Sequence, residues 1–356
     1  MKRIFVFLLV LAEFITLFGC GEKETLEPIS SSPSVSRMVS DSSPLETNQS
    51  AAVCMGSVSH PVHRIVQLGF MEKADELGYE GHILGLSEGS VQELYDCWLA
   101  GAQEHDIAGA VCWVGDDSAY EFLKELHGMG VKTVVPRFPH PYEETKGFID
   151  ANIYANKDAM VERAAEFICQ TLQKNHIDSG EIGVCVNMHD YSDGVFRKYI
   201  LYHYPEYKVI NSQIVGAEKM DAQKKVTDYI RNNPEMKAIL GMTSICSQII
   251  SAAKKETGRN DIIVVGYDVW SSLEFISNGS VDACISNPGY EEGYVGMEIL
   301  DNLLGGRLYN ISEEHWRQEL PGPLVYSGGI GKENPAYYDE LFHCVKTRFV
   351  VSETNA

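Results

Sequence analysis

Residues 52–86, AVCMGSVSHPVHRIVQLGFMEKADELGYEGHILGL, contain the pattern from which the fold can be predicted. Two short apolar runs, Ala52–Val58 and Gly81–Leu86, flank a segment of helical period. Apolar side chains recur in that segment at steps of four, four and three residues, on one face of a helix: Val66, Phe70, Ala74 and Leu77. A strand, a helix and a strand in this order predict a βαβ unit with parallel strands.

The same alternation continues along the chain in two series of apolar runs. The first series is Ala52–Val58, Gly81–Leu86, Ile107–Val114, Val131–Val135 and Gly147–Ile153. The second is Ile182–Val186, Lys208–Val215, Ala238–Met242, Ile262–Tyr267 and Val281–Ser286. We therefore expect an α/β fold with two doubly wound, Rossmann-like lobes. Open α/β sheets bind ligands beside the carboxyl ends of their strands, so the expected site is a cleft between the lobes.

Composition and motifs exclude several classes of function. The 356 residues exceed what one hydrophobic core usually organises. The formal net charge of -21, without a basic cluster, argues against nucleic acid as a partner. Neither G-x-G-x-x-G nor G-x-x-x-x-G-K-[ST] occurs in the sequence. We expect no enzymatic activity, no cofactor and no metal, since the H-x-x-H pair His60 and His63 has no further ligand in view.

The N-terminus predicts export. Lys2 and Arg3 precede the short apolar run Ile4–Ala12, as in a signal peptide. The following residues 17–20, LFGC, resemble the lipobox of bacterial lipoproteins, which implies that Cys20 carries the lipid. Glu13 and Phe18 depart from the usual pattern, and an ordinary or uncleaved secretory signal is the alternative. Residues 21–50 are rich in Ser, Pro, Glu and Thr and predict a flexible tether. The other eight cysteines lie mostly in apolar runs, so we expect buried thiols rather than disulfides.

Several segments, in order, resemble the ribose-binding type of periplasmic sugar-binding proteins. The opening His60-Pro61-Val62-His63, then Gly69-Phe70 and Gly78-Tyr79, is similar to the family's first turn and helix. Later matches are residues 130–135 (GVKTVV), 151–152 (AN), 266–268 (GYD) and 282–287 (DACISN), followed by Gly293. The resemblance implies a type I periplasmic binding protein fold whose lobes hinge shut on ligand. It implies one lobe of about 51–151 plus 287–315 and another of 153–284 plus part of 316–350.

This resemblance implies a monomeric solute-binding lipoprotein of an ABC-type uptake system, outside the cytoplasm. Lactose-repressor-type regulators share the same body but begin with a DNA-reading helix-turn-helix, which an export signal replaces here. An external sensor module for a membrane receptor remains the main alternative, followed by a glycan-processing enzyme. The partners implied are a sugar or related polyol, an ABC permease or membrane sensor, and the membrane through the lipid.

The expected site residues follow strand ends or family positions. Asp268 ends a strand and can accept two sugar hydroxyls, although it could equally cap the next helix. Tyr267, Trp270 and Trp113 are candidates for stacking on a sugar ring, or for core packing. The resemblance adds Asn152, Asn287, His60, His63 and a position near Asp190. Arg137 stands where the family has an acidic residue, so a sugar acid competes with a neutral sugar.

Overall fold

We describe the protein from a computed structural model, which covers residues 49–114, 117–187, 191–216, 218–307 and 312–350. The predicted signal peptide with Cys20, most of the predicted tether, and Asp190 lie outside the described residues. Among the helices described, none is long and apolar enough to span a membrane.

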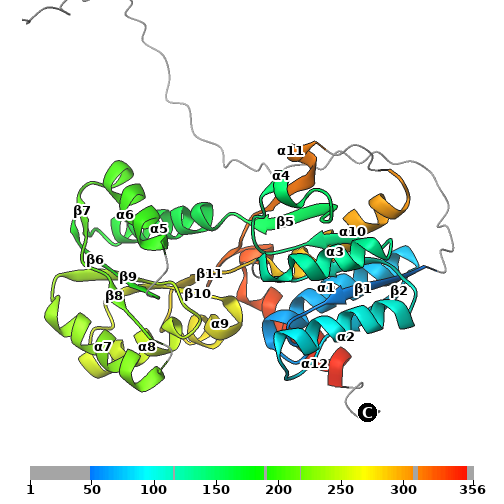
Figure 1. Ribbon diagram of the computed structural model, residues 1–356. Coiled ribbons are helices and arrows are strands. Elements are labelled where there is room, and N and C mark those ends of the chain that lie inside the picture. Colours follow the sequence, from blue (N-terminus) through cyan, green and yellow to red (C-terminus); the bar gives the residue numbers. More distant parts are fainter. Residues whose placement is uncertain (1–48, 115–116, 188–190, 217, 308–311, 351–356) are drawn as a thin grey trace, which may run out of the picture. The chain divides into compact units, whose positions relative to one another are not determined.

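The first sheet has six parallel strands in the order β12-β5-β4-β3-β1-β2 (Figure 1). Its strands are β1 (Ser50–Cys54), β2 (Glu80–Leu84), β3 (Ile107–Cys112), β4 (Lys132–Val135), β5 (Ala151–Ala155) and β12 (Arg317–Leu320). Val53 of β1 packs under α1 (Pro61–Leu77) and α10 (Gly289–Leu304). The next residue, Cys54, packs on the other face with α2 (Val91–Glu104) and α3 (Tyr120–Gly128). Successive side chains of a strand point to opposite faces, so each face of this sheet has its own core.

Two glycines bring α1 and α10 together closely. A Cβ added at Gly69 would lie 2.1 Å from the carbonyl oxygen of Tyr290, and one at Gly293 would lie 1.9 Å from that of Val66. Only glycine permits this backbone approach. α1 itself begins at Pro61 behind the N-cap His60, and ends at Gly78, whose φ of 78° is left-handed.

The second sheet has the order β13-β11-β10-β9-β6-β7, with β8 beside β6. Its strands are β6 (Gly180–Val186), β7 (Tyr207–Val209), β8 (Gln213–Ile214), β9 (Met236–Gly241), β10 (Ile263–Tyr267), β11 (Ala283–Ile285) and the antiparallel β13 (Leu324–Tyr326). α5 (Lys157–Lys174) and α6 (Ser192–His203) cover one face. The opposite core contains α7 (Lys219–Asn232), α8 (Cys246–Thr257), α9 (Val269–Ser277) and α12 (Pro335–Val350). Short helices α4 (Tyr142–Thr145) and α11 (Glu313–Trp316) and 3-10 turns η1 (Asp117–Ala119) and η2 (Gly331–Glu333) complete the elements.

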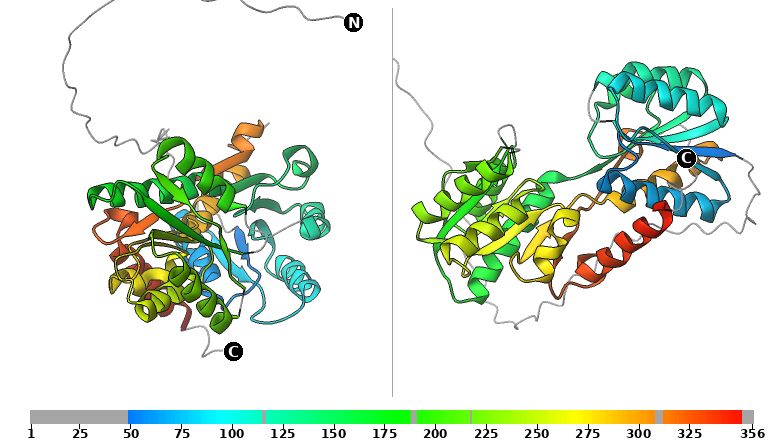
Figure 2. Two further views of the ribbon diagram at one scale, coloured as in Figure 1. Left: turned by 90° about the vertical axis from the view of Figure 1, so that its left-hand side faces the viewer. Right: turned by 90° about the horizontal axis from the view of Figure 1, so that it is seen from below.

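The chain passes between the two sheets three times: after β5, after β11, and between β12 and β13 (Figure 2). Every predicted apolar run overlaps an observed strand, and the run Lys208–Val215 is divided into β7 and β8. One expected boundary needs correction. All of β5 pairs in the first sheet, so residues 153–155 belong with that sheet and not with the second. β12 and β13 were not anticipated.

Cysteine chemistry agrees with the expectation of buried thiols. The eight cysteines in the described part of the chain are all free, and six of them are buried. Burial raises the pKa of the Cys54 and Cys185 thiols, which keeps them protonated and poorly nucleophilic.

Candidate functional site

A cavity of about 400 Å³ contains four of the predicted site residues: Arg137, Tyr267, Asp268 and Asn287. This volume falls in the range of cavities that bind small molecules. The strand ends of the second sheet form one part of its wall. The rest comes from the loop after β4, the beginnings of α1, α5 and α10, and part of α12.

Four strands of the second sheet point their carboxyl ends at this cavity. Asn187 follows β6, Met242 and Thr243 follow β9, Asp268 follows β10, and Ser286 follows β11. In parallel sheets these ends lie on one edge, where α/β proteins place ligands. The cavity therefore lies at the position that strand order alone predicts for a binding site.

Asp268 is both a helix cap and a wall of the cavity. Its Oδ1 accepts a hydrogen bond from the backbone N–H of Trp270, 3.2 Å away, which caps α9. Its Oδ2 has no hydrogen-bond partner within the described residues. Burial raises the pKa of Asp268, while the Trp270 N–H and the charge of Arg137 oppose that rise. The two interpretations of Asp268, cap and ligand group, are thus compatible, one oxygen serving each.

The backbone at two cavity residues is strained. Asp268 has φ 70° and Arg137 has φ 87°, in the left-handed region that non-glycine residues rarely adopt. Such conformations persist where surrounding structure enforces them, and they cluster at functional sites. The backbone N–H of Asp268 donates to the carbonyl of Ile285 at 2.8 Å, which holds the strained residue at the strand end.

Tyr267 and Asn287 form a polar pair beside Asp268. The Asn287 amide donates to the Tyr267 hydroxyl oxygen at 2.7 Å. Next to them the Ser286 hydroxyl accepts from the Val269 N–H at 3.2 Å. Burial raises the pKa of Tyr267, so its hydroxyl is a neutral donor at neutral pH. The pair offers a mixture of donors and acceptors of the kind that polyhydroxy ligands need.

Arg137 is neutralised inside the protein by Glu292, a residue that the sequence analysis did not identify. The Arg137 Nη2 lies 2.9 Å from the Glu292 Oε2, and the two side chains are 8% and 0% exposed. Burial raises the pKa of Glu292, and the positive charge of Arg137 opposes that rise. Neither atom of this close contact, nor Arg137 Nε or Glu292 Oε1, has a hydrogen-bond partner in the described chain, so the contact is an ion pair without hydrogen-bond geometry.

The histidines and Trp113 lie outside this cavity, and their rings contact one another at tilted angles. The rings of His63 and Trp113 are 4.7 Å apart, and those of His60 and His63 are 5.0 Å apart. His63 Nδ1 lies 3.0 Å from the Ser57 nitrogen, and burial lowers the His63 pKa to about 4. Trp113 lines a smaller cavity and its Nε1 has no partner among the described residues. Val62, between the two histidines, lines the main cavity, so this aromatic group adjoins it.

Asn152 and Trp270 also lie away from the cavity. Asn152 is fully buried; its amide donates to the Val135 and Phe138 carbonyls at 2.8 Å and its oxygen accepts from the His140 N–H at 3.0 Å. These bonds brace the loop that carries Arg137. The Trp270 ring packs edge-on against Phe342, with centroids 4.3 Å apart. Neither Asn152 nor Trp270, both expected as ligand groups, is among the residues that line this cavity.

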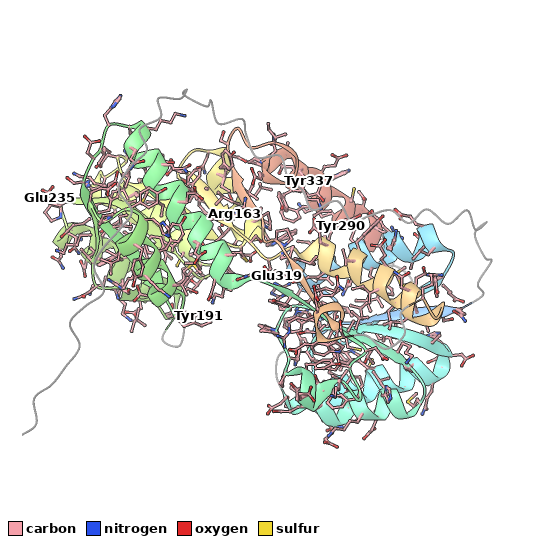
Figure 3. The ribbon with its side chains drawn as sticks, turned by 90° about the horizontal axis from the view of Figure 1, so that it is seen from above. Arg163, Tyr191, Glu235, Tyr290, Glu319 and Tyr337 are labelled. Carbon is pink, nitrogen blue, oxygen red and sulfur yellow. The ribbon has the colours of Figure 1, made fainter. Side chains whose placement is uncertain are left out.

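Several cavity residues were missed from the sequence, for two different reasons. Asn187, Thr243 and Ser244 follow apolar runs, and strict use of the strand-end rule would have found them. Tyr290, Tyr337 and Tyr338 come from α10 and α12, where no strand end marks them (Figure 3 labels Tyr290 and Tyr337). Only packing brings these tyrosines to the cavity.

The sequence and the fold are similar to those of known binding proteins. The sequence model of the family described as "Periplasmic binding protein domain" matches residues 51–308. The ribose import binding protein RbsB of Escherichia coli K12 is 19% identical over 258 residues, which are 72% of this chain and 84% of that protein. The D-apiose import binding protein of Actinobacillus succinogenes is 24% identical over 107 residues, 30% of this chain and only 34% of that protein.

A solved structure shows the same fold. The arabinose-binding protein AraP of Geobacillus stearothermophilus superposes with a TM-score of 0.70, over 82% of this chain and 99% of that protein, at 13% identity. The expected fold class is thereby confirmed: two sheets of mostly parallel strands, each layered with helices, in the type I arrangement.

Proposed function

Since the chain belongs to the periplasmic binding protein domain family, we propose that it is a lipid-anchored sugar-binding protein that supplies an ABC-type uptake system. The family is a non-enzymatic one of extracytoplasmic solute-binding proteins. The relatives named above are an import binding protein for ribose, one for D-apiose and an arabinose-binding protein. The ligand of this chain, the lipid on Cys20, the monomeric state and the permease partner are parts of the proposal.

The Arg137–Glu292 ion pair is the main observation that favours a neutral sugar over a sugar acid as the ligand. A sugar acid needs an unsatisfied cation, yet Arg137 is already within 2.9 Å of a buried carboxylate. Two carboxylates line the cavity itself, Asp268 and Glu291, and Glu291 is paired with Lys332. An anionic ligand would lose its hydration on entering the cavity, and Arg137, already paired with Glu292, would not compensate for that loss. The proposed ligand is therefore a neutral sugar.

Each wall of the cavity has a proposed role in sugar binding. Asp268 Oδ2 accepts a sugar hydroxyl, because Oδ1 is already used by the helix cap. Tyr267 and Asn287 supply further hydrogen bonds, and Thr243 supplies one from the end of β9. Hydrogen bonds to a charged carboxylate contribute about 1.5–3 kcal/mol, so Asp268 is expected to dominate the affinity. Closure of the lobes about the three crossings, at the boundaries 155–156, 286–288 and 320–324, completes the proposal.

A thermal-shift screen with matched sugars tests the proposed ligand class. D-galactose and D-glucose are compared with D-galacturonate and D-glucuronate, and D-ribose and L-arabinose extend the neutral set. Ligand that binds only the folded protein raises its melting temperature by mass action. We expect larger shifts for neutral sugars than for the matched acids. Larger shifts for the two acids would contradict the neutral-ligand proposal.

A substitution at Asp268 then tests the site. Asp268→Asn preserves the helix cap and tolerates positive φ, so it changes mainly the charge. We expect about tenfold weaker binding of the best neutral sugar by titration calorimetry. Asp106→Asn is the matched control, because Asp106 also has positive φ (48°) but is exposed and outside the cavity. If Asp268→Asn and Asp106→Asn bind the sugar with equal affinity, the sugar does not bind at Asp268.

A further inference from the structure

Helix α12 lies outside the segment that defines the family, yet it forms part of the cavity. The family match ends at residue 308, whereas α12 spans Pro335–Val350. Tyr337, Tyr338 and Leu341, from its first two turns, line the same cavity as Asp268 and Arg137. One wall of the cavity therefore comes from a segment that the family pattern does not describe.

Contacts at several points hold α12 in place. It packs against α1 of the first sheet and α9 of the second (Figure 2, red helix). Arg348 is ion-paired with Asp75 of α1 at 2.5 Å, and the Phe342 ring packs edge-on against Trp270 of α9. Leu341 and Val345 are buried in one cluster with Leu68 of α1 and Leu273 of α9. The tyrosines at its start are thus presented from a fixed support.

The hydroxyl of Tyr338 lacks a partner in the described chain. The Tyr338 side chain is 7% exposed, and its hydroxyl makes no hydrogen bond to any described residue. By contrast, Tyr290 in the same wall donates its hydroxyl to the Glu72 carboxylate at 2.5 Å. A hydroxyl without a described protein partner, on a residue that lines a polar cavity, has the chemistry of a ligand contact.

We propose that α12 is part of the binding site and that the Tyr338 hydroxyl forms a hydrogen bond with a hydroxyl or ring oxygen of the bound sugar. This inference rests on the proposed function. Tyr338 would then distinguish sugars that place an oxygen at α12 from those that do not. The neighbouring ring of Tyr337, perpendicular to that of Tyr338 with centroids 5.1 Å apart, limits the rotation of Tyr338.

The test compares Tyr338→Phe with the unaltered full-length protein. Titration calorimetry is run with D-ribose, L-arabinose, D-galactose and D-glucose. Tyr199→Phe on α6 is the control, because Tyr199 is a part-buried tyrosine outside the cavity. We expect the tightest of these sugars to bind Tyr338→Phe about three- to tenfold more weakly, the usual effect of losing one neutral hydrogen bond. Tyr199→Phe should bind it as the unaltered protein does.

Monodeoxy analogues of that sugar separate a direct contact from a structural effect. The analogue that lacks the partner oxygen should bind the unaltered protein and Tyr338→Phe equally, as in a double-mutant cycle. The melting temperature without sugar should not change, since the lost hydroxyl has no described partner in the protein. Equal sugar affinity in Tyr338→Phe overturns the inference and leaves the proposed function standing. If none of the four sugars binds the unaltered protein, the proposed function fails and the inference fails with it.

Discussion

Removing the positive partner of the buried ion pair should destabilise the protein strongly. In Arg137→Met the Glu292 carboxylate, which is 0% exposed, would remain buried without its counter-charge. Breaking a buried pair in this way costs about 3–5 kcal/mol. For a chain of this size the loss corresponds to a decrease of about 6–10 °C in melting temperature. Differential scanning fluorimetry without sugar measures it directly.

The effect should depend on pH in a defined direction. Burial holds the Glu292 pKa above its usual value of 4.5, and removing the charge of Arg137 raises that pKa further. A carboxyl with a raised folded-state pKa contributes its full stability below the unfolded pKa, and this contribution is lost as pH rises through the folded pKa. The melting-temperature deficit of Arg137→Met should therefore be larger at pH 8 than at pH 5.

Two further variants serve as controls for this prediction. Arg231→Met breaks the exposed ion pair with Glu256, for which we expect a loss of about 0–1 kcal/mol. The double variant Arg137→Met with Glu292→Leu removes both charges and should recover much of the stability, because no buried charge is left alone. If Arg137→Met melts like the unaltered protein at pH 8, or its deficit is equal at both pH values, the reasoning about Glu292 is refuted.

Three more outcomes are expected. Cys20→Ser should move the protein from the membrane to the soluble fraction on centrifugation; a variant that still sediments with membranes must be anchored elsewhere. Saturating sugar should lower the radius of gyration in solution scattering as the lobes close, and an unchanged radius at proven saturation would exclude a closing hinge. Asn152→Ala should lower stability by about 1–3 kcal/mol, because it leaves the buried His140 N–H and the Val135 and Phe138 carbonyls without their partner; an unchanged melting temperature would contradict this bracing role.

Local patterns of residues were sufficient to predict the two sheets and the sheet edge at which the proposed site lies. Short apolar runs that alternate with segments of helical period predict parallel sheets. Such patterns can be recognised in the sequence because they involve residues that are neighbours in the chain. Asp268 was identifiable for the same reason: it directly follows a buried strand, and strand ends share an edge. β12 (Arg317–Leu320) was missed because its four residues are mostly polar, and β13 (Leu324–Tyr326) because three residues are too few to show a period.

By itself the sequence determined the α/β class, the order of the elements and the carboxylate proposed to dominate the site, since these depend on residues close together in the chain. Only the tertiary structure decided how that carboxylate is surrounded. The pairing of Arg137 with Glu292 joins the loop after β4 to α10, and it changes a free cation into a neutral pair. Tyr338 of α12 lines a cavity whose other residues follow strands that are distant from it in the sequence. Such contacts depend on how helices pack against sheets, and no local pattern of residues encodes them.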